Sequence, residues 1–404
     1  MTKDYGSLYI VSTPIGNLDD ITISAGATTG TAAFNPTDDS VYEGDETGII
    51  AIDTVSGGGA TENSTPQAVT LTISENESAP TVTLTSSASS IAENAGTSLT
   101  LTATLSGATD EAVTVGISTS GTGTEGSGGD YATVSDITIS AGATTGTASF
   151  TPIDDSSYEG DETGIIAIAT VSGGGASESG SQSVAVTITE NESEPTVTLT
   201  TSATSIAENA GTSLTLTATL SVATTADVTV ALSTSGTATE GTDYTDSSGN
   251  IDDIVISAGS TTGTVSFTPT DDSLYDATSN ETATIAISGV SGGSASESGT
   301  QSVTITITDN ESAPTVTLAV SATSIAENAG SSLTLTATLS NATTADVTVS
   351  IDGTGGTGTE GTDFGTVSDI TISAGSTTGT ASFTPTDDST YEGNETAIIA
   401  ISSV

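Results

Sequence analysis

The residues with the most chemical potential in this chain are carboxylates gathered into one short stretch. Residues 154–162 read D-D-S-S-Y-E-G-D-E and carry five acids in nine positions. Related stretches occur at 38–46, at 271–281 and at 387–395. Carboxylates held this close repel each other strongly unless a cation lies between them. The chain has Lys+Arg 1 against Asp+Glu 51, so we expect the neutralising cation to come from outside the protein.

The ligand atoms that the side chains can offer a metal are mainly oxygen. The chain contains no His and no Cys, which removes the usual general base, thiolate chemistry and zinc–sulfur sites. Carboxylate, hydroxyl and carbonyl oxygens suit hard cations, calcium above all. The formal charge of -50 excludes nucleic acids and anionic membranes as partners, because both bind basic surfaces. The sequence has no run of 18 apolar residues and no visible signal peptide, so we expect no membrane insertion in this segment.

The acidic stretch is one part of a longer repeat. The block D-I-T-I-S-A-G begins at Asp20, Asp136 and Asp369, and appears as D-I-V-I-S-A-G at Asp253, a spacing of about 116 residues. This is the size of one small domain and is too long for one turn of a solenoid. We therefore expect a tandem array that is cut at both ends. Its predicted parts are a non-repeat segment at 1–19, a partial first repeat at 20–78 (strands D–G), a second repeat at 79–193, a third at 194–312, and a fourth at 313–404 that lacks its last strand.

Within one repeat, apolar and polar residues alternate. In the third repeat this pattern predicts seven strands, A to G, at 196–200, 213–220, 228–232, 254–257, 264–267, 282–287 and 302–307. An acidic chain with 3% aromatic residues could be disordered, but its 33% hydrophobic residues lie in these short runs. The expected fold class is all-β, a tandem series of immunoglobulin-like antiparallel β-sandwiches. Each core is small and aliphatic, so each domain should be marginally stable without a bound ion.

The acids occupy alternate loops of each predicted sandwich. If consecutive strands alternate in direction, loops A–B, C–D and E–F and the segment after strand G meet at one pole, and these carry most of the acids. The loops of the opposite pole hold only Asp227 and Glu297 in the third repeat. This placement favours a shared cation site over the alternative that the acids are solvated loop charges. The acids expected at the site are Glu93, Asp130, Asp154, Asp155, Glu159, Glu162, Glu190 and Glu192 in the second repeat, and Glu208, Asp243, Asp271, Asp272, Asp276, Glu281, Asp309 and Glu311 in the third. Glu240 of the third-repeat C–D loop lies at the same pole.

The motifs of the repeat resemble those of the Calx-beta domain. They are I-A-E-N-A-G, G-T-D-Y, P-T-D-D followed by Y-E-G-D-E, and T-I-T-D-N-E, in this order, over nearly all of residues 20–404. The resemblance implies sandwiches of the Calx-beta type with Ca²⁺ bound at one end by these acids. Carried over to the fourth repeat, the implied ligands are Glu327, Asp363, Asp387, Asp388, Glu392 and Glu395. Asn191 and Asn310 depart from the fully acidic terminal triplet, and complete sites are expected only in the second and third repeats.

Residues 1–19 do not fit the repeat. Residues 8–22 alone resemble the N-terminus of the family of small-subunit ribosomal RNA 2′-O-methyltransferases (tetrapyrrole methylase-like). In that family a strand followed by P-I-G-N contributes to the S-adenosylmethionine pocket. The methylase domain does not follow here, and a chain of charge -50 could not hold ribosomal RNA. The resemblance thus implies a methyltransferase in name only, through a gene fusion or an assembly join near Asp20.

The leading functional hypothesis is a calcium-binding structural or adhesion segment of a larger surface or secreted protein of bacterial type. Calcium would make the domain junctions rigid, and the protein would be extracellular or at the cell surface. The alternative is a calcium-dependent module that binds a glycan or a cell-surface protein, although Tyr 8, Phe 5 and Trp 0 offer few aromatic platforms for a sugar. The recurring Tyr42, Tyr158, Tyr275 and Tyr391 are expected to be local packing anchors.

An enzyme is not expected. Paired carboxylates can hydrolyse glycosides, but a pair copied in every repeat is an unusual active site. No His, Cys or basic side chain is available to tune or orient it.

Overall fold

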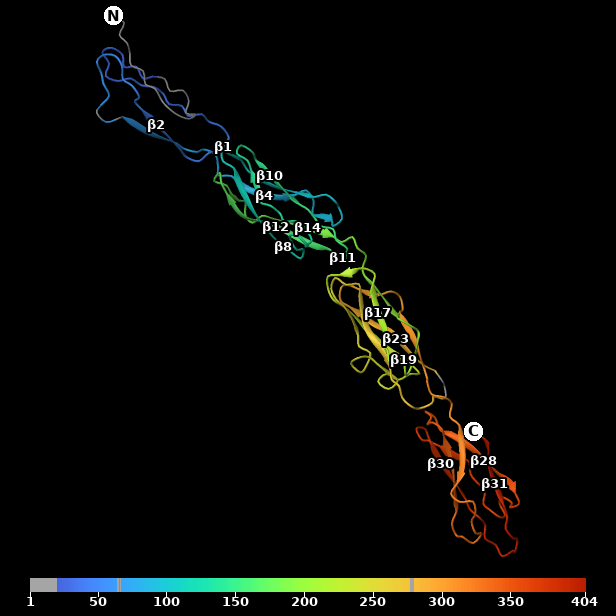
Figure 1. Cartoon of the computed structure of the whole chain (residues 1–404). Helices are drawn as coiled ribbons and strands as arrows, with labels where there is room; N and C mark the ends of the chain where they lie inside the picture. Colours follow the sequence, from blue (N-terminus) through green and yellow to red (C-terminus); the bar gives the residue numbers. More distant parts are fainter. Residues whose placement is uncertain (1–19, 64, 66, 277–279) are drawn as a thin grey trace. The chain divides into compact units, whose positions relative to one another are not determined.

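The computed structural model describes residues 20–63, 65, 67–276 and 280–404, and the regular secondary structure of these residues is β-strand throughout (Figure 1). Its contacts divide the chain into two compact units. The first contains Met1–Asp155 and Glu159–Asn191, and the second contains Ser156–Tyr158 and Glu192–Val404. The part of the methyltransferase resemblance at 8–19 lies outside the described residues, and residues 20–22 form no strand.

The first repeat contains less regular structure than expected. Its strands are β1 (Val41–Tyr42), β2 (Glu46–Ala51) and β3 (Ala68–Ile73), and only β2 and β3 pair with each other. Residues 20–35, where strands D and E were expected, form no strand. In the complete repeats these two strands pair with strands C and B. The described part of the first repeat contains neither, so the hydrogen-bonding partners that strands D and E need are missing.

The second repeat is a sandwich of two sheets. One sheet has the order β10-β6-β4-β13 and the other has the order β5-β14-β12-β8-β9. The strands of this repeat are β4 (Thr81–Ser86), β5 (Ser90–Ala92), β6 (Leu99–Leu105), β7 (Ala108–Thr109), β8 (Val113–Gly121), β9 (Ile137–Ile139), β10 (Thr145–Phe150), β11 (Ser157–Tyr158), β12 (Glu162–Ser172), β13 (Ser177–Glu178) and β14 (Ser183–Thr189).

The third repeat has the same architecture, with sheets β20-β22-β17-β15-β24 and β16-β25-β23-β19-β21. Seven of its strands lie where the alternating pattern predicts strands A to G. The strands of this repeat are β15 (Thr196–Thr201), β16 (Ser205–Ala207), β17 (Leu214–Leu220), β18 (Ala223–Thr224), β19 (Val228–Gly236), β20 (Tyr244–Thr245), β21 (Ile254–Ile256), β22 (Thr262–Pro269), β23 (Asn280–Ser291), β24 (Ser296–Glu297) and β25 (Ser302–Thr308).

The fourth repeat has two smaller sheets, β26-β27-β30 and β29-β28-β31. Its strands are β26 (Val316–Val320), β27 (Leu333–Leu339), β28 (Val347–Gly356), β29 (Ile370–Ile372), β30 (Thr378–Phe383) and β31 (Ala397–Ser403). The all-β prediction of tandem immunoglobulin-like sandwiches is confirmed. No helix long and apolar enough to cross a membrane occurs among the residues that the structure describes.

Each core is aliphatic and is completed by one aromatic pair. In the third repeat, Leu216, Val230 and Ile285 are fully buried between the sheets. Tyr244 and Phe267 stack beside them, with ring centroids 4.7 Å apart. Tyr131 and Phe150 form the same pair in the second repeat, also at 4.7 Å. The tyrosine of the C–D loop is therefore a core residue, and it fixes the acid that precedes it in the sequence.

The other recurring tyrosines are not local packing anchors. Within the first compact unit, β1, which ends at Tyr42, pairs in parallel with β7 of the second repeat. Within the second compact unit, β11, which ends at Tyr158, pairs in parallel with β18, and Tyr275 forms an isolated bridge with Thr343 of the fourth repeat. Tyr391 is 97% exposed. The expectation was wrong because the first three of these tyrosines pair outside their own repeat, whereas Tyr391 is exposed to solvent.

Candidate metal centre

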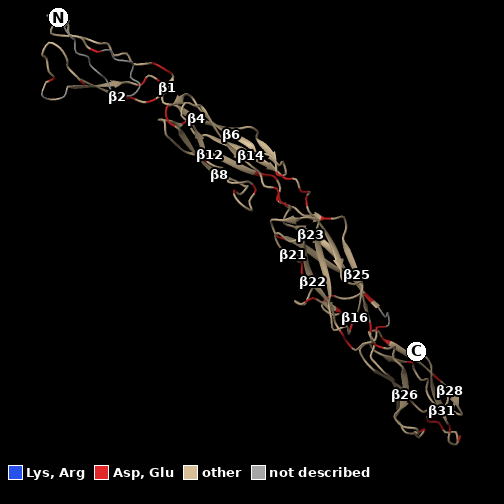
Figure 2. Ribbon diagram, turned by 45° about the horizontal axis from the view of Figure 1, so that its top comes forward, with Lys and Arg blue, Asp and Glu red and all other residues tan. Residues whose placement is uncertain are grey.

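In the third repeat, the first and last acidic segments are joined by strand pairing. The short strand β16 runs parallel to the end of β25, and the Glu208 N–H donates to the Thr308 carbonyl at 3.0 Å. Asp309 and Glu311 follow β25 directly. This pairing leaves Glu208 only 8% exposed. Figure 2 shows Asp and Glu gathered in the loops near β16, whereas the strands are largely free of charge.

The C–D loop brings its acid to the same end of the sandwich. The Tyr244 ring is 1% exposed in the core, which anchors the neighbouring Asp243. The Asp243 carboxylate accepts the Thr239 N–H at 2.6 Å. Its backbone carbonyl accepts the Thr270 N–H at 2.9 Å and so connects this loop to the E–F loop.

The E–F loop is held across the pole by its backbone. The Asp272 N–H donates to Glu208 Oε1 at 2.9 Å, and the Asp276 N–H donates to Asp309 Oδ2 at 2.9 Å. Asp271 accepts the side-chain amide of Asn310 at 3.2 Å. These bonds fix the positions of the carboxylates through main-chain groups, and oxygen atoms remain directed into the space between the loops.

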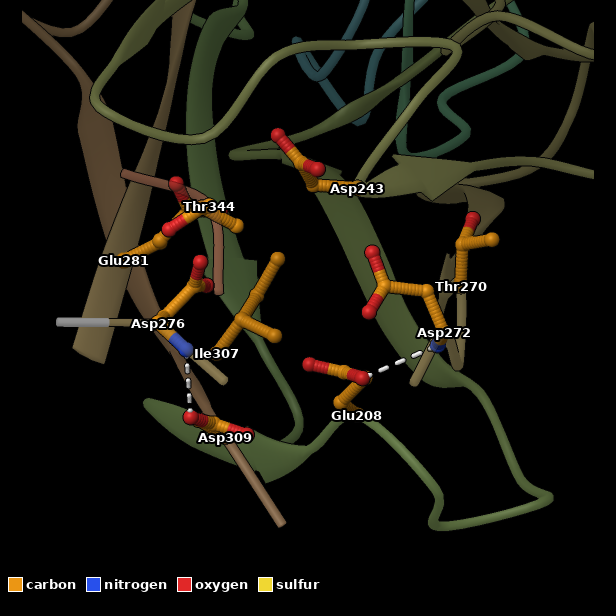
Figure 3. Close-up of a pocket in the computed structure, with 9 residues that line it drawn as sticks. All are labelled: Glu208, Asp243, Thr270, Asp272, Asp276, Glu281, Ile307, Asp309 and Thr344. Carbon is orange, nitrogen blue, oxygen red and sulfur yellow. Dashed lines mark hydrogen bonds between the residues drawn. The ribbon is translucent and has the colours of Figure 1, made fainter. Parts of the chain in front are cut away.

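Together these segments enclose a cavity of about 140 Å³. The residues that line it, drawn in Figure 3, are Glu208, Asp243, Thr270, Asp272, Asp276, Glu281, Ile307, Asp309 and Thr344. Of the eight acids expected in this repeat, six line the cavity. Glu311 offers an oxygen within 4.8 Å of oxygens of Glu208 and Asp309, and Asp271 adjoins Asp272 in the sequence.

Burial and repulsion between neighbouring carboxylates disfavour the charged form of several acids in this cavity. Burial raises the pKa of Glu281 to about 7, and the charges of Asp243 and Asp276 add to the effect. Burial also raises the pKa of Glu208 by more than the hydrogen bond from the Asp272 N–H lowers it. Partial burial, with a hydrogen bond to Asp309, raises the pKa of Glu311 to about 7. Protons or a metal cation would relieve this repulsion.

The second repeat repeats the arrangement around Asp130, Glu159 and Glu162, whose carboxylate oxygens lie within 4.8 Å of one another. Burial raises the pKa of Glu159 to about 8 and that of Glu162 to about 7, and hydrogen bonds with Asp130 add to both shifts. Burial acts to raise the pKa of Asp130 as well. Hydrogen bonds from the Thr124 N–H and from the two glutamates outweigh it and lower that pKa. A metal cation among these oxygens would offset the burial and the repulsion that raise the two glutamate pKa values.

A second pair of carboxylates lies beside this cluster. Oxygens of Glu93 and Glu190 approach within 4.8 Å, and Glu93 is 7% exposed. The Asp155 N–H donates to Glu93 at 3.2 Å, and Glu190 accepts the N–H groups of Glu159 at 2.6 Å and of Gly160 at 2.9 Å. The remaining predicted ligands of this repeat are Asp154, which is exposed, and Glu192, which is half-buried and belongs to the second compact unit.

The acids of the fourth repeat form clusters that are mostly exposed to solvent. Carboxylates of Glu327, Asp388 and Glu392 form one cluster, and those of Asp363, Glu392 and Glu395 form another, each within 4.8 Å. The Asp388 N–H donates to Glu327 at 3.0 Å, as its counterpart does in the third repeat. All of these acids except Asp363 are exposed, as is Asp387.

Sequence reasoning missed three features of these sites. Thr344 belongs to the fourth repeat and lines the third-repeat cavity, and no pattern within one repeat could have indicated it. Glu240 instead supports its own C–D loop, since it accepts the Ile251 N–H at 2.5 Å and the Thr234 hydroxyl at 2.7 Å. In the first repeat, Glu75 accepts the Glu43 N–H at 2.6 Å, as Glu190 does from Glu159. The position of Glu75 in the repeat was the signal that could have revealed this feature.

The donor set fits calcium. The polar groups of the third-repeat cavity are carboxylates and threonines, so they offer hard oxygen ligands. Burial raises the pKa values of Glu208 and Glu281, as expected at a site where a divalent cation would supply positive charge. The arrangement can bind an ion and tie together four segments of the chain. The residues that could hold it in the third repeat are the eight predicted from the sequence.

The fold and the site define a tandem array of β-sandwich domains with acidic clusters at loop ends. The Calx-beta domain family matches residues 75–192, 190–311 and 309–404, and the chain belongs to this family. Tandem domains of this family support a calcium-binding repeat segment. No curated protein matches the chain.

Several solved structures resemble the chain at low sequence identity. The chain is 20% identical to CBD12 from CALX1.2, covering 50% of this chain and 77% of that one with a TM-score of 0.23. It is 16% identical to the calcium binding domain CBD12 of CALX1.1, with the same coverage and TM-score. It is 16% identical to invasin, a bacterial integrin-binding protein, covering 75% and 54% with a TM-score of 0.29. The family assignment rests on the three segments of the chain that match the Calx-beta domain family.

Proposed function

We propose that the chain is a calcium-binding, tandem-repeat structural segment of a larger surface or secreted protein, with repeats bounded at 20–78, 79–193, 194–312 and 313–404. One observation carries the proposal. Six carboxylates from four segments of the third repeat line one cavity, and burial with mutual repulsion raises the pKa of Glu281 to about 7. The ligands in this proposal are the acids predicted from the sequence in the second, third and fourth repeats.

Calcium in this proposal acts as a stabiliser of small domains. The cores are aliphatic and each contains one aromatic pair, so a modest binding energy matters. At a free concentration ten times the dissociation constant, each site would add about 1.4 kcal/mol to the free energy of unfolding. Dissociation constants of ~10⁻⁴–10⁻³ M are typical of extracellular calcium modules. With sites of that strength, the segment would bind calcium where free calcium is high, so the proposal includes an extracellular or cell-surface location.

The test is a calcium titration of the full chain by calorimetry and by thermal unfolding, with magnesium as the comparison ion. We expect binding heat and a rising unfolding temperature with calcium. The variant Asp309→Asn should lose part of both effects, because Asp309 lines the cavity and receives the Asp276 N–H. Asp53→Asn is the matched control, since it removes one exposed carboxylate outside the predicted sites. An unfolding temperature that calcium does not move, together with no binding heat, would refute the proposal.

A further inference from the structure

The acidic loop of the third repeat is joined to the fourth repeat by main-chain hydrogen bonds. The Tyr275 N–H donates to the Ala342 carbonyl at 2.9 Å, and the Thr344 N–H donates to the Tyr275 carbonyl at 3.2 Å. These two bonds form a parallel bridge between Tyr275 and Thr343. All four residues belong to loops, so the bonds connect the two sandwiches without forming part of either one.

The receiving loop is already shaped by its own repeat. Thr343 is 4% exposed, its hydroxyl donates to the Ala345 carbonyl at 2.6 Å, and its carbonyl accepts the Gly375 N–H at 2.9 Å. A loop fixed in this way loses little conformational entropy when it docks. The bridge therefore joins the acidic segment of the third repeat to a loop that the fourth repeat already holds in place.

The same device occurs within the first compact unit. Strand β1 pairs with β7, and the Asp110 N–H donates to the Tyr42 carbonyl at 3.3 Å. Thr109 is fully buried and its hydroxyl donates to the Glu111 carbonyl at 2.7 Å, as Thr343 does two residues on in its loop. Gly175 leaves room for the Tyr42 ring, because a Cβ there would lie 2.6 Å from Tyr42 Cε1. Because the same kind of pairing joins the first repeat to the second and the third repeat to the fourth, we interpret it as a structural joint between repeats.

In the third repeat, the pairing of Tyr275 with the 342–344 loop and the carboxylate cavity share residues or have residues that are adjacent in the sequence. Asp276 follows Tyr275 directly, and it lines the cavity while its N–H binds Asp309. Thr344, whose N–H donates to the Tyr275 carbonyl, lines the cavity as well (Figure 3). The cavity of one repeat thus has one wall contributed by the next repeat.

We propose that the fourth repeat completes the divalent-cation site of the third, with Thr344 as the closing residue and Tyr275 as the residue that holds the two repeats together. This inference rests on the proposed function, since it assigns a partner and a regulation to the same cavity. A cation that draws Asp276 and Glu281 inward holds Tyr275 against the 342–344 loop. The bare carboxylates repel one another and oppose that pairing. Thr344 supplies neutral oxygen of the kind that calcium accepts.

The first test measures affinity. The full chain carries Glu93→Gln with Glu159→Gln in the second repeat and Glu327→Gln with Glu392→Gln in the fourth, so that each of the other two sites loses two of its carboxylates. Calcium binding is then followed by calorimetry. Thr344→Val should weaken binding about tenfold. Thr348→Val, the same change at an exposed position of β28, is the matched control and should leave affinity unchanged. Equal affinity for Thr344→Val and its control would overturn the role of Thr344.

The second test measures the joint. Because the chain has no cysteine, Val255→Cys on β21 and Ile398→Cys on β31, both more than half exposed, allow spin labels to report the distance between the third and fourth repeats. We expect a broad distance distribution in chelator and a narrow one in calcium. Thr344→Pro removes the N–H that binds Tyr275 and should keep the distribution broad in calcium. If calcium binds but the distribution does not change, the joint is refuted and the proposed function stands. If calcium does not bind at all, both fail.

Discussion

The third and fourth repeats carry nearly the same acids and hold them differently. Glu208 is 8% exposed, whereas its counterpart Glu327 lies in the open. Glu208 follows β16, which pairs with β25. Among the described residues of the fourth repeat, 324–326 form no strand and nothing corresponds to β25. The sheets of the third repeat have five strands each, and those of the fourth have three.

The difference shows that the last strand of the sandwich organises the site. Strand β25 holds β16, which places Glu208, and its end carries Asp309 and Glu311. Two of the four acidic segments therefore depend on one strand. Where the strand is present, burial raises the pKa of Glu281 to about 7. In the fourth repeat the pKa of Glu392 is also raised, by weaker burial and by neighbouring carboxylates, but the side chain stays exposed.

The largest effect should come from weakening the support of β16. Ile206 on this strand is 8% exposed and belongs to the core of the third repeat. Ile206→Ala should cost about 3 kcal/mol of unfolding free energy, because it opens a cavity beneath the strand. The matched variant Ile325→Ala, at a half-buried position with no strand, should cost less than about 1 kcal/mol. Hydrogen exchange resolved by repeat would measure both, and equal costs would contradict the role given to β16.

A second comparison concerns calcium affinity. Glu208→Gln removes a buried carboxylate from an enclosed cavity, so we expect a loss of about tenfold or more in affinity at the third repeat. Glu327→Gln removes an exposed carboxylate, and the loss at the fourth repeat should be about threefold or less. Calorimetric titration of the full-length variants would test this. A larger loss of calcium affinity for Glu327→Gln than for Glu208→Gln would contradict this expectation.

Metal-free stability should depend on pH, and more strongly in the repeats with buried acids. The pKa of Glu281 rises from 4.5 to about 7 on folding, so the folded state binds a proton more readily than the unfolded state. Its contribution to stability is full below pH 4.5 and is lost as the pH rises through about 7. In chelator, the third repeat should therefore melt at a higher temperature at pH 5 than at pH 8. Glu281→Gln should flatten this profile, and Glu395→Gln in the fourth repeat should change it less. A melting temperature that rises with pH would contradict the sign.

The smallest effect separates two equivalent tyrosines. Tyr391→Ala changes a side chain that is 97% exposed, and the change in unfolding free energy should stay within about 0.5 kcal/mol. Tyr275→Ala alters a half-buried residue at the joint with the fourth repeat and should cost about 1 kcal/mol. Thermal unfolding in calcium would rank the two. The same cost for both would mean that the Tyr275 ring adds nothing to the main-chain bridge.

The alternating pattern alone predicted the strands and the pole of the third repeat. Since side chains in a strand point to opposite faces in turn, apolar residues at every second position identify a half-buried strand. Seven antiparallel strands in sequence then decide which loops meet, and Glu208, Asp243, Asp276 and Asp309 do meet at one cavity. Whether those residues bind calcium stays a proposal.

The sequence by itself thus determined the fold class, the repeat and the identity of the acids that gather, because these follow from local periodicity and strand direction. Tertiary structure decided how deeply each acid is buried and which residue of the next repeat closes the cavity. Burial of Glu208 depends on pairing with a strand about 100 residues away, and Thr344 reaches the cavity through hydrogen bonds between loops. Such contacts are set by the packing of distant segments, and no periodicity within one repeat encodes them.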